Sequence, residues 1–305
     1  MSGVWALQVL TYLAILVCLV VIVRKTIRYA TAPMHLRWEI YPVPHEVGKE
    51  YGGSYLEETD WWTKPRHTSL VNEVKAMVPE MLLIETLWKH NRPMWFVSFP
   101  FHGGIYVSVG FVVLLIIGGI AQAAGGVVDA SVGGLGTFLH YLTIVVGVIG
   151  MVSVAVGALG LLAKRSGEEL RAQSAPADYF NLVFILLIAV VGLVAWATVD
   201  SSFSEIRSFM QGLVSLNPPD TLAGAVIAEV VLISLWLLYM PFTHMTHFVG
   251  KYFTYHTVRW EDAPNLRGSK LDQELGQLLQ RRVSWAAPHI GEGTWVEVAT
   301  REVTD

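Results

Sequence analysis

Cysteine and charge are both scarce in this sequence of 305 residues. Cys18 is the only cysteine, so the chain cannot by itself hold a cysteine-ligated iron–sulfur cluster or a covalent haem on a C-x-x-C-H motif. Charged residues make up 15% of the chain, against about 25% in an ordinary soluble protein. A G-x-x-x-x-G-K-[ST] phosphate loop is absent, and the net charge of −4 argues against nucleic acid as a partner.

Apolar residues are abundant and gather in long runs. They form 53% of the chain, and a membrane-crossing helix needs about 20 of them in succession. Five runs meet that length: Val4–Val23, Trp95–Ala121, Gly136–Ala163, Phe180–Thr198 and Leu222–Val249. We therefore predict an all-α integral membrane protein, a bundle of five transmembrane helices.

Lysine and arginine predict how the bundle is oriented, because they concentrate in cytoplasmic loops. Arg24, Lys25 and Arg28 follow the first run, and Lys164 and Arg165 follow the third, whereas residues 122–135 contain neither type. The N-terminus is expected outside and the C-terminus in the cytoplasm. The first run has no preceding basic residue and no clear cleavage site, so we expect it to be retained as a helix.

Two polar parts flank these runs. Residues 1–260 are predicted to form the membrane domain, including a cytoplasmic loop, 24–93, and residues 261–305 a cytoplasmic tail with a helical patch at Leu271–Arg282. The loop interleaves Trp and Tyr with charges and prolines, which favours a partner-docking segment or an aromatic belt at the membrane surface. Within it, Val71–Asn91 has spaced apolar positions typical of an interfacial helix.

Histidines at membrane depth carry the functional prediction, because polar groups there are costly. His102 lies in "SFPFHGGIY", roughly 13 Å along the second span from Pro93. If the fifth span stays helical to His256, His247 reaches a similar level from the opposite direction. Two facing imidazoles are what a six-coordinate b-type haem needs, and Gly103 with Gly104 would let a flat macrocycle approach the backbone.

The motifs around these histidines resemble a known family. "FHGG" and "PFTHMTH" look like the F-H-x-G and P-F-[ST]-x-x-x-H motifs of the gamma subunit of respiratory nitrate reductase. "LRWEIYPVPHE" and "WKHNRPMWFVSFPFH" look closer to related membrane subunits of Tmc and Dsr complexes, which accompany heterodisulfide-reductase-like iron–sulfur proteins. The resemblance, over residues 1–260, implies a cytochrome b in a prokaryotic cytoplasmic membrane. His102 and His247 would ligate its haem b iron.

The departures from that family concern a second haem. At the positions of its two ligands this sequence has Val112 and Glu229, neither of which suits a b-type haem. His140 with an unusual partner, or His90 with His256, remains as an alternative pair. One haem is therefore expected from the sequence. Whether a second haem is also bound stays an open question at this point.

Two further assignments concern quinone and the haem edge. We hypothesise that His140 and Glu229 flank an outer-leaflet quinone pocket, in which His140 bonds a carbonyl and Glu229 handles a proton. A structural role for the carboxylate is an equally good interpretation. His244 occupies a position that is basic in the family, which implies a haem-propionate contact, and it is also the rival of His247 as iron ligand.

The sequence thus favours an electron-transfer subunit and not a complete enzyme. It would move electrons between menaquinone, or another quinone, and a cytoplasmic iron–sulfur subunit of the heterodisulfide-reductase-like type. Bond-breaking chemistry would belong to partner subunits. The alternative is a haem-free anchor or transporter, which the sequence supports less well because it shows neither broken helices nor inverted repeats.

Overall fold

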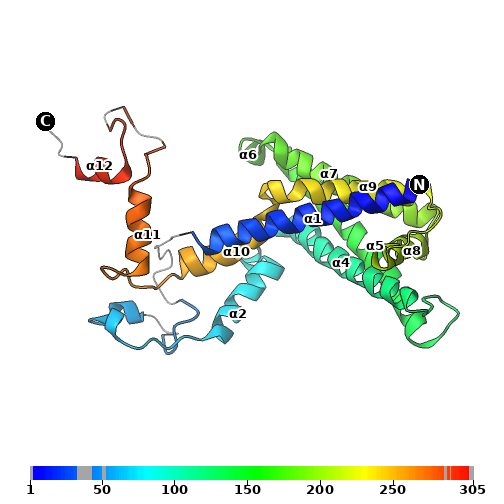
Figure 1. The fold of residues 1–305 in the computed structure, drawn as a ribbon, viewed down its shortest axis with the longest axis horizontal. Helices are drawn as coiled ribbons and strands as arrows, with labels where there is room; N and C mark the ends of the chain where they lie inside the picture. The colour runs from blue at the N-terminus through cyan, green and yellow to red at the C-terminus, as the bar shows by residue number, and fades with distance from the viewer. Residues whose placement is uncertain (1–2, 33–42, 50–52, 285–286, 289, 302–305) are drawn as a thin grey trace. The chain divides into compact units, whose positions relative to one another are not determined.

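The fold was analysed in a computed structural model that describes residues 3–32, 43–49, 53–284, 287–288 and 290–301. Regular structure in these ranges is helical, apart from the isolated bridges between Glu46 and Thr68 and between Arg282 and Thr294. Five helices are long and apolar enough to cross a membrane (Figure 1). They are α1 (Gly3–Ala30), α4 (Arg92–Ala123), α5 (Gly134–Arg165), α7 (Pro176–Thr198) and the segment Gly224–Phe242, which begins with α9 (Gly224–Tyr239). The predicted all-α architecture with five helices of membrane-spanning length is confirmed, while the sidedness of its termini stays a prediction.

The chain divides into two compact units. The first comprises residues 1–22 and 75–246, and the second comprises residues 23–74 and 247–305. The predicted boundary at residue 260 differs from this division, because the tail shares a unit with most of the cytoplasmic loop. The first seven residues of "LRWEIYPVPHE", and residues 50–52 of the loop, lie outside the described residues.

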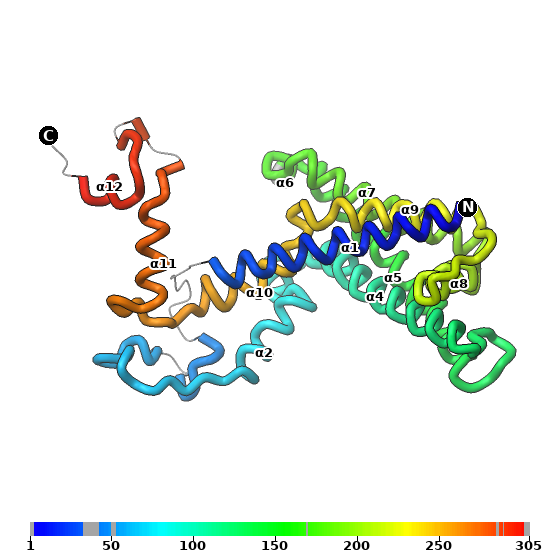
Figure 2. The backbone as a smooth tube through the Cα atoms, viewed as in Figure 1, coloured from blue at the N-terminus to red at the C-terminus, as the bar shows by residue number. Residues whose placement is uncertain are grey.

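Close backbone contact between α4 and α5 organises the first unit. A Cβ at Gly104 of α4 would lie 2.6 Å from the backbone nitrogen of Val154, and a Cβ at Gly150 of α5 would lie 2.8 Å from Ser108 Oγ. The missing side chains let the two helices run side by side as an antiparallel hairpin (Figure 2). Small residues commonly serve this purpose between membrane helices, where lipid tails are as apolar as the helices themselves.

The short helix α8 (Ser204–Ser215) packs on α4 in the same unit. Its Arg207 is buried against Gly118, and it donates hydrogen bonds to the carbonyl oxygens of Val128 (3.3 Å) and Ser202 (2.9 Å). Arg207 therefore joins α8 to the loop that connects α4 with α5.

Polar contacts attach the first part of α1 to the same unit. Gln8 donates to the carbonyl oxygen of Gly212 at the end of α8, and the hydroxyls of Thr11 and Ser234 are 3.1 Å apart. Both bonds are buried, so they satisfy polar groups inside an otherwise apolar bundle.

The fifth span is not one continuous helix, and this corrects the sequence prediction. After α9 ends at Tyr239, the chain makes two 3₁₀ turns, η4 (Met240–Phe242) and η5 (His244–Thr246). Helix α10 (His247–Phe253) and a π-helical turn, η6 (Thr254–Arg259), follow. Pro241 explains the break, because its ring removes a backbone donor and crowds the preceding turn.

The interfacial helix predicted over Val71–Asn91 is also divided. It consists of α2 (Leu70–Val78), one π-helical turn, η3 (Pro79–Leu83), and α3 (Glu85–His90). Ile84 separates the last two in a left-handed conformation with φ 54°. The predicted helix in the tail is confirmed as α11 (Lys270–Leu279), and a short α12 (Trp295–Thr300) follows it.

Candidate functional site

His102 is held in one orientation by its own helix. Its Nδ1 lies 2.8 Å from the backbone carbonyl oxygen of Ser98, one turn earlier on α4, and 3.3 Å from the Ser98 hydroxyl. A carbonyl oxygen only accepts hydrogen bonds, so Nδ1 carries the proton and the lone pair of the neutral ring lies on Nε2. Histidines that bind a metal through one ring nitrogen usually donate the N–H of the other nitrogen to a carbonyl or carboxylate oxygen in this way.

The two glycines after His102 have different surroundings. Gly104 faces α5, where Val154 occupies the space that a side chain would need. A Cβ at Gly103 would meet only the Phe99 ring, at 3.8 Å. The prediction that both glycines admit a macrocycle is therefore wrong for Gly104, whereas the three atoms nearest to a Cβ at Gly103 all belong to the Phe99 ring of the same helix, at 3.8 to 4.0 Å.

His244 pairs with charged and polar groups of α7. Its Nε2 lies 3.3 Å from Asp178 Oδ1 and 3.4 Å from Asn181 Nδ2, and Tyr239 donates a hydrogen bond of 2.9 Å to the Asn181 carbonyl oxygen. Arg165 also approaches Asp178, at 3.7 Å. A haem propionate would have to compete with the Asp178 carboxylate for His244, and an iron atom would have to displace this carboxylate from Nε2.

His247 and His256 belong to the second unit. His247 is the first residue of α10, and His256 Nδ1 lies 3.8 Å from Glu73 Oε2 with its ring 4.4 Å from that of Tyr252. His102 and His90 belong to the first unit, so the pairs His102–His247 and His90–His256 both stay predictions. Among the described residues, no group of three or more His, Cys, Asp or Glu could hold a metal ion, which leaves two-histidine haem ligation as the metal chemistry under consideration.

His140 and Glu229 are both buried, with 7% and 6% of their surface exposed. His140 Nδ1 has no hydrogen-bond partner in the described part of the chain. A Cβ added at Gly192 would lie 2.7 Å from Glu229 Oε1 and 2.6 Å from the Met151 sulfur. Glu229 therefore lies beside Met151. Met151 is eleven residues beyond His140 on α5, so a pocket that touched both side chains would extend about 16 Å along this helix.

Sequence reasoning missed a polar cluster around His45 in the second unit. His45 is buried, its Nε2 lies 3.0 Å from Asp262 Oδ2, and its Nδ1 lies 3.9 Å from Glu73 Oε1. Arg66 also binds Asp262, at 2.8 Å. These contacts join the loop 24–93 to the segment after the fifth span, and nothing in the local sequence pattern signals such long-range pairs.

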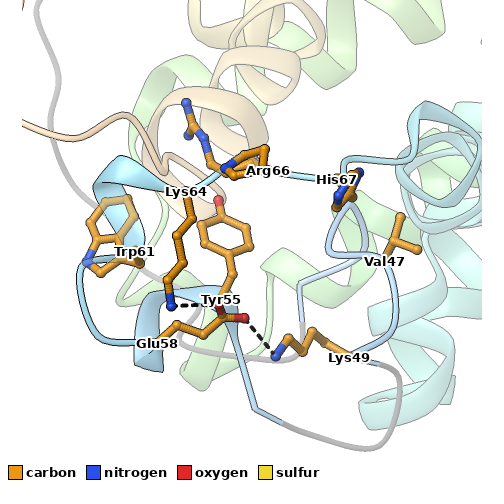
Figure 3. Close-up of a pocket in the computed structure, with 9 residues that line it drawn as sticks. Val47, Lys49, Tyr55, Glu58, Trp61, Lys64, Arg66 and His67 are labelled. Carbon is orange, nitrogen blue, oxygen red and sulfur yellow. Dashed lines mark hydrogen bonds and ion pairs between the residues drawn. The ribbon is translucent and has the colours of Figure 1, made fainter.

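A small hollow of about 90 Å³ lies close by in the same loop (Figure 3). Lys49 and Lys64 approach the Glu58 carboxylate from two sides, at 3.5 and 3.4 Å. The hydrogen bond and charge of Lys64, with a smaller effect of Lys49, lower the pKa of that carboxyl group. Glu58 thus offsets one of the two lysine charges, and the hollow is too small for a haem or a quinone.

Comparison with known proteins agrees with the motifs around His102 and His247. The family model described as "Nitrate reductase gamma subunit" matches residues 86–261, more than half of the chain. This chain belongs to the nitrate reductase gamma subunit family. The predicted resemblance is confirmed, and the match covers α4, α5, α7, α9 and α10.

A similar curated protein gives a second comparison for this gamma-family chain. It is a "Hdr-like menaquinol oxidoreductase cytochrome b-like subunit" of Archaeoglobus profundus, 28% identical over 129 residues. The alignment covers 40% of this chain and 37% of the relative, which is little more than a third of the relative's length. No solved structure matches the chain significantly.

Proposed function

We propose that this gamma-family protein is the haem b subunit of a membrane-bound menaquinol oxidoreductase. It would carry electrons between menaquinone, or another quinone, and an iron–sulfur subunit of the heterodisulfide-reductase-like type in the cytoplasm. The family membership and the name of the Archaeoglobus relative support the cytochrome b and menaquinol parts. Substrate chemistry beyond electron transfer is assigned to partner subunits.

The hydrogen bond from His102 Nδ1 to the Ser98 carbonyl oxygen is the observation that carries the haem assignment. It leaves Nε2 as the lone-pair nitrogen of the neutral ring. His247 is the preferred second ligand, because His244 Nε2 already faces Asp178. When bound, the haem would supply one-electron transfer across the inner half of the bundle.

The orientation and the quinone site are part of the same proposal. The distribution of Lys and Arg favours an outside N-terminus and a cytoplasmic C-terminus, in the cytoplasmic membrane of a prokaryote. We place quinol chemistry in the outer half, where Glu229 would accept or return a proton and His140 offers an unpaired ring nitrogen. Quinol oxidation there would release protons outside and contribute to the membrane potential.

The second candidate function is a haem-free anchor or transporter subunit that docks a cytoplasmic protein. The broken helices at Pro79–Leu83 and Met240–Thr246 favour it more than the sequence alone did, because transporters commonly contain such breaks. The orientation of His102 and the two matched family motifs remain unexplained under this alternative.

The decisive experiment is a reduced-minus-oxidised visible spectrum of the purified full-length subunit, with a pyridine haemochrome assay to count haem b per chain. One haem per chain, reducible by a menaquinol analogue, is the expected result. Two haems would support the proposal and bring His140, or His90 with His256, into ligation. A chain without haem, from cells that load a control cytochrome b, would contradict the proposal and favour the anchor.

A further inference from the structure

The π-helical turn η3 is attached to α4 by two side-chain hydrogen bonds. The Trp95 indole donates to the backbone carbonyl oxygen of Leu83 over 2.7 Å, and the Tyr106 hydroxyl donates to that of Met81 over 2.8 Å. Trp95 and Tyr106 are eleven residues apart and share one face of α4 with His102, because the spacings of seven and four residues repeat the helical turn. The turn therefore runs along the face of α4 that presents His102.

The depth of the turn follows from Tyr106. Tyr106 is fourteen residues beyond Arg92, the first residue of α4, which is about 21 Å along the helix axis. A tyrosine hydroxyl reaches about 6.5 Å from its own Cα and leans toward the helix N-terminus. With the 2.8 Å hydrogen bond added to that reach, the Met81 carbonyl lies roughly 12 Å or more past the start of α4. The candidate membrane span covers the whole of α4, Arg92–Ala123, so this level lies within the span.

The same two bonds meet the requirement that lipid places on irregular backbone. In the hydrocarbon region a carbonyl without a hydrogen-bond partner costs several kcal/mol, whereas at a water-exposed loop the solvent satisfies it. The change from α2 to a π-turn, and the left-handed Ile84 after it, interrupt the regular backbone ladder. Trp95 and Tyr106 supply donors from α4 to two of the carbonyls at this interruption.

The outer surface of the turn is apolar. Between Met77 and Ile84 only Glu80 is charged, and its carboxylate accepts the backbone N–H of Thr86 at the start of α3. Val78, Leu82 and Leu83 are 44%, 48% and 52% exposed. Phe96 on α4 is exposed as well, at 61%.

We propose that residues 77–84 form a re-entrant turn, which dips into one leaflet beside the His102 face of α4 and contacts lipid acyl chains through Val78, Leu82 and Leu83. This surface is not a protein-docking site. The turn also shields the His102 face from the lipid. The proposal needs α4 to span the membrane but does not depend on haem.

Cysteine accessibility tests this proposal directly. Leu82→Cys and Leu83→Cys are each introduced into a Cys18→Ala background. The variants are prepared as open membrane sheets, so that both membrane faces are exposed, and are treated with a membrane-impermeant polyethylene-glycol maleimide. Thr63→Cys, at an exposed polar position in the turn η2 (Trp61–Thr63), is the control. We expect Thr63→Cys to react fully and the two leucine positions to react at least about tenfold more slowly until detergent is added.

Adding Tyr106→Phe tests the anchoring bond. The variant removes one donor to the turn, so we expect faster labelling of Leu82→Cys with unchanged labelling of Thr63→Cys. Spin labels at the leucine positions give a second readout, since a lipid-buried label is relaxed more by oxygen than by a soluble nickel chelate. The proposal would be overturned if the two leucine positions were labelled in sheets as fast as Thr63→Cys. Stronger relaxation of the spin labels by nickel than by oxygen would also overturn it. Neither outcome depends on haem content, so it is distinguishable from a failure of the cytochrome assignment.

Discussion

Nε2 of His244 lies 3.3 Å from Oδ1 of Asp178, on a different helix of the same unit. This ion-pair geometry separates His244 from His247, which stands three residues later at the start of α10. The sequence left either histidine as a ligand. The structure gives His244 a carboxylate partner, and that contact distinguishes their expected roles.

The first prediction compares these two histidines. His247→Ala is expected to remove the haem, while His244→Ala keeps it, because the His244 side chain is engaged by Asp178. Pyridine haemochrome per purified chain is the measurement, and the yield of intact protein in detergent controls for misfolding. Loss of haem in His244→Ala together with retention in His247→Ala would reverse the assignment.

The second prediction concerns His102. His102→Ala should abolish haem binding, whereas Ser98→Ala should retain it, because the 2.8 Å bond to His102 uses the backbone carbonyl of Ser98 and not its hydroxyl. The reduced spectrum of Ser98→Ala should therefore keep its α-band. If both variants contain a full complement of haem, His102 is not a ligand.

The third prediction concerns Glu229. Glu229→Gln keeps the shape of the side chain but cannot take up a proton, so quinol-linked haem reduction should slow at least about tenfold with an unchanged haem spectrum. Ser234→Ala is a control on the same helix, because Ser234 is buried against Thr11. Normal rates in Glu229→Gln would leave this carboxyl group a structural role only.

The fourth prediction uses two adjacent glycines of α4. Gly104→Ala places a Cβ 2.6 Å from the Val154 backbone and should lower the free energy of unfolding by about 1–3 kcal/mol. Gly103→Ala meets only the Phe99 ring and should be neutral or stabilising by up to about 1 kcal/mol. Thermal unfolding in detergent compares them, and equal destabilisation would contradict the described contact between α4 and α5.

The fifth prediction concerns the buried Arg207. Burial lowers the pKa of its guanidinium, which nevertheless stays charged near neutral pH. Arg207→Met would leave the carbonyls of Val128 and Ser202 without this donor, at a cost of about 2–4 kcal/mol in unfolding free energy. Ser215→Ala, at the exposed end of α8, should change it by less than about 0.5 kcal/mol. Similar unfolding curves for both variants would show that Arg207 does not stabilise this end of the bundle.

The sequence by itself determined the five membrane-spanning helices and the family. A run of about 20 apolar residues has one stable structure in lipid, because an α-helix satisfies its backbone within the segment. Short motifs around His102 and His247 were sufficient to indicate the family, since they are read locally. The tail helix was also predictable from its local apolar spacing.

Only the tertiary structure decided how individual side chains are used. Gly103 and Gly104 are the same residue type, yet Gly104 faces α5 and Gly103 faces the Phe99 ring of its own helix, because helix rotation turns adjacent residues about 100° apart. Three contacts join residues that lie 25 to 217 positions apart in the sequence: His244–Asp178, His45–Asp262 and Tyr106–Met81. The prolines at the breaks, Pro79 and Pro241, are visible in the sequence. The neighbouring helices, however, decide which backbone groups lose their hydrogen bonds at each break and which side chains then bind those groups.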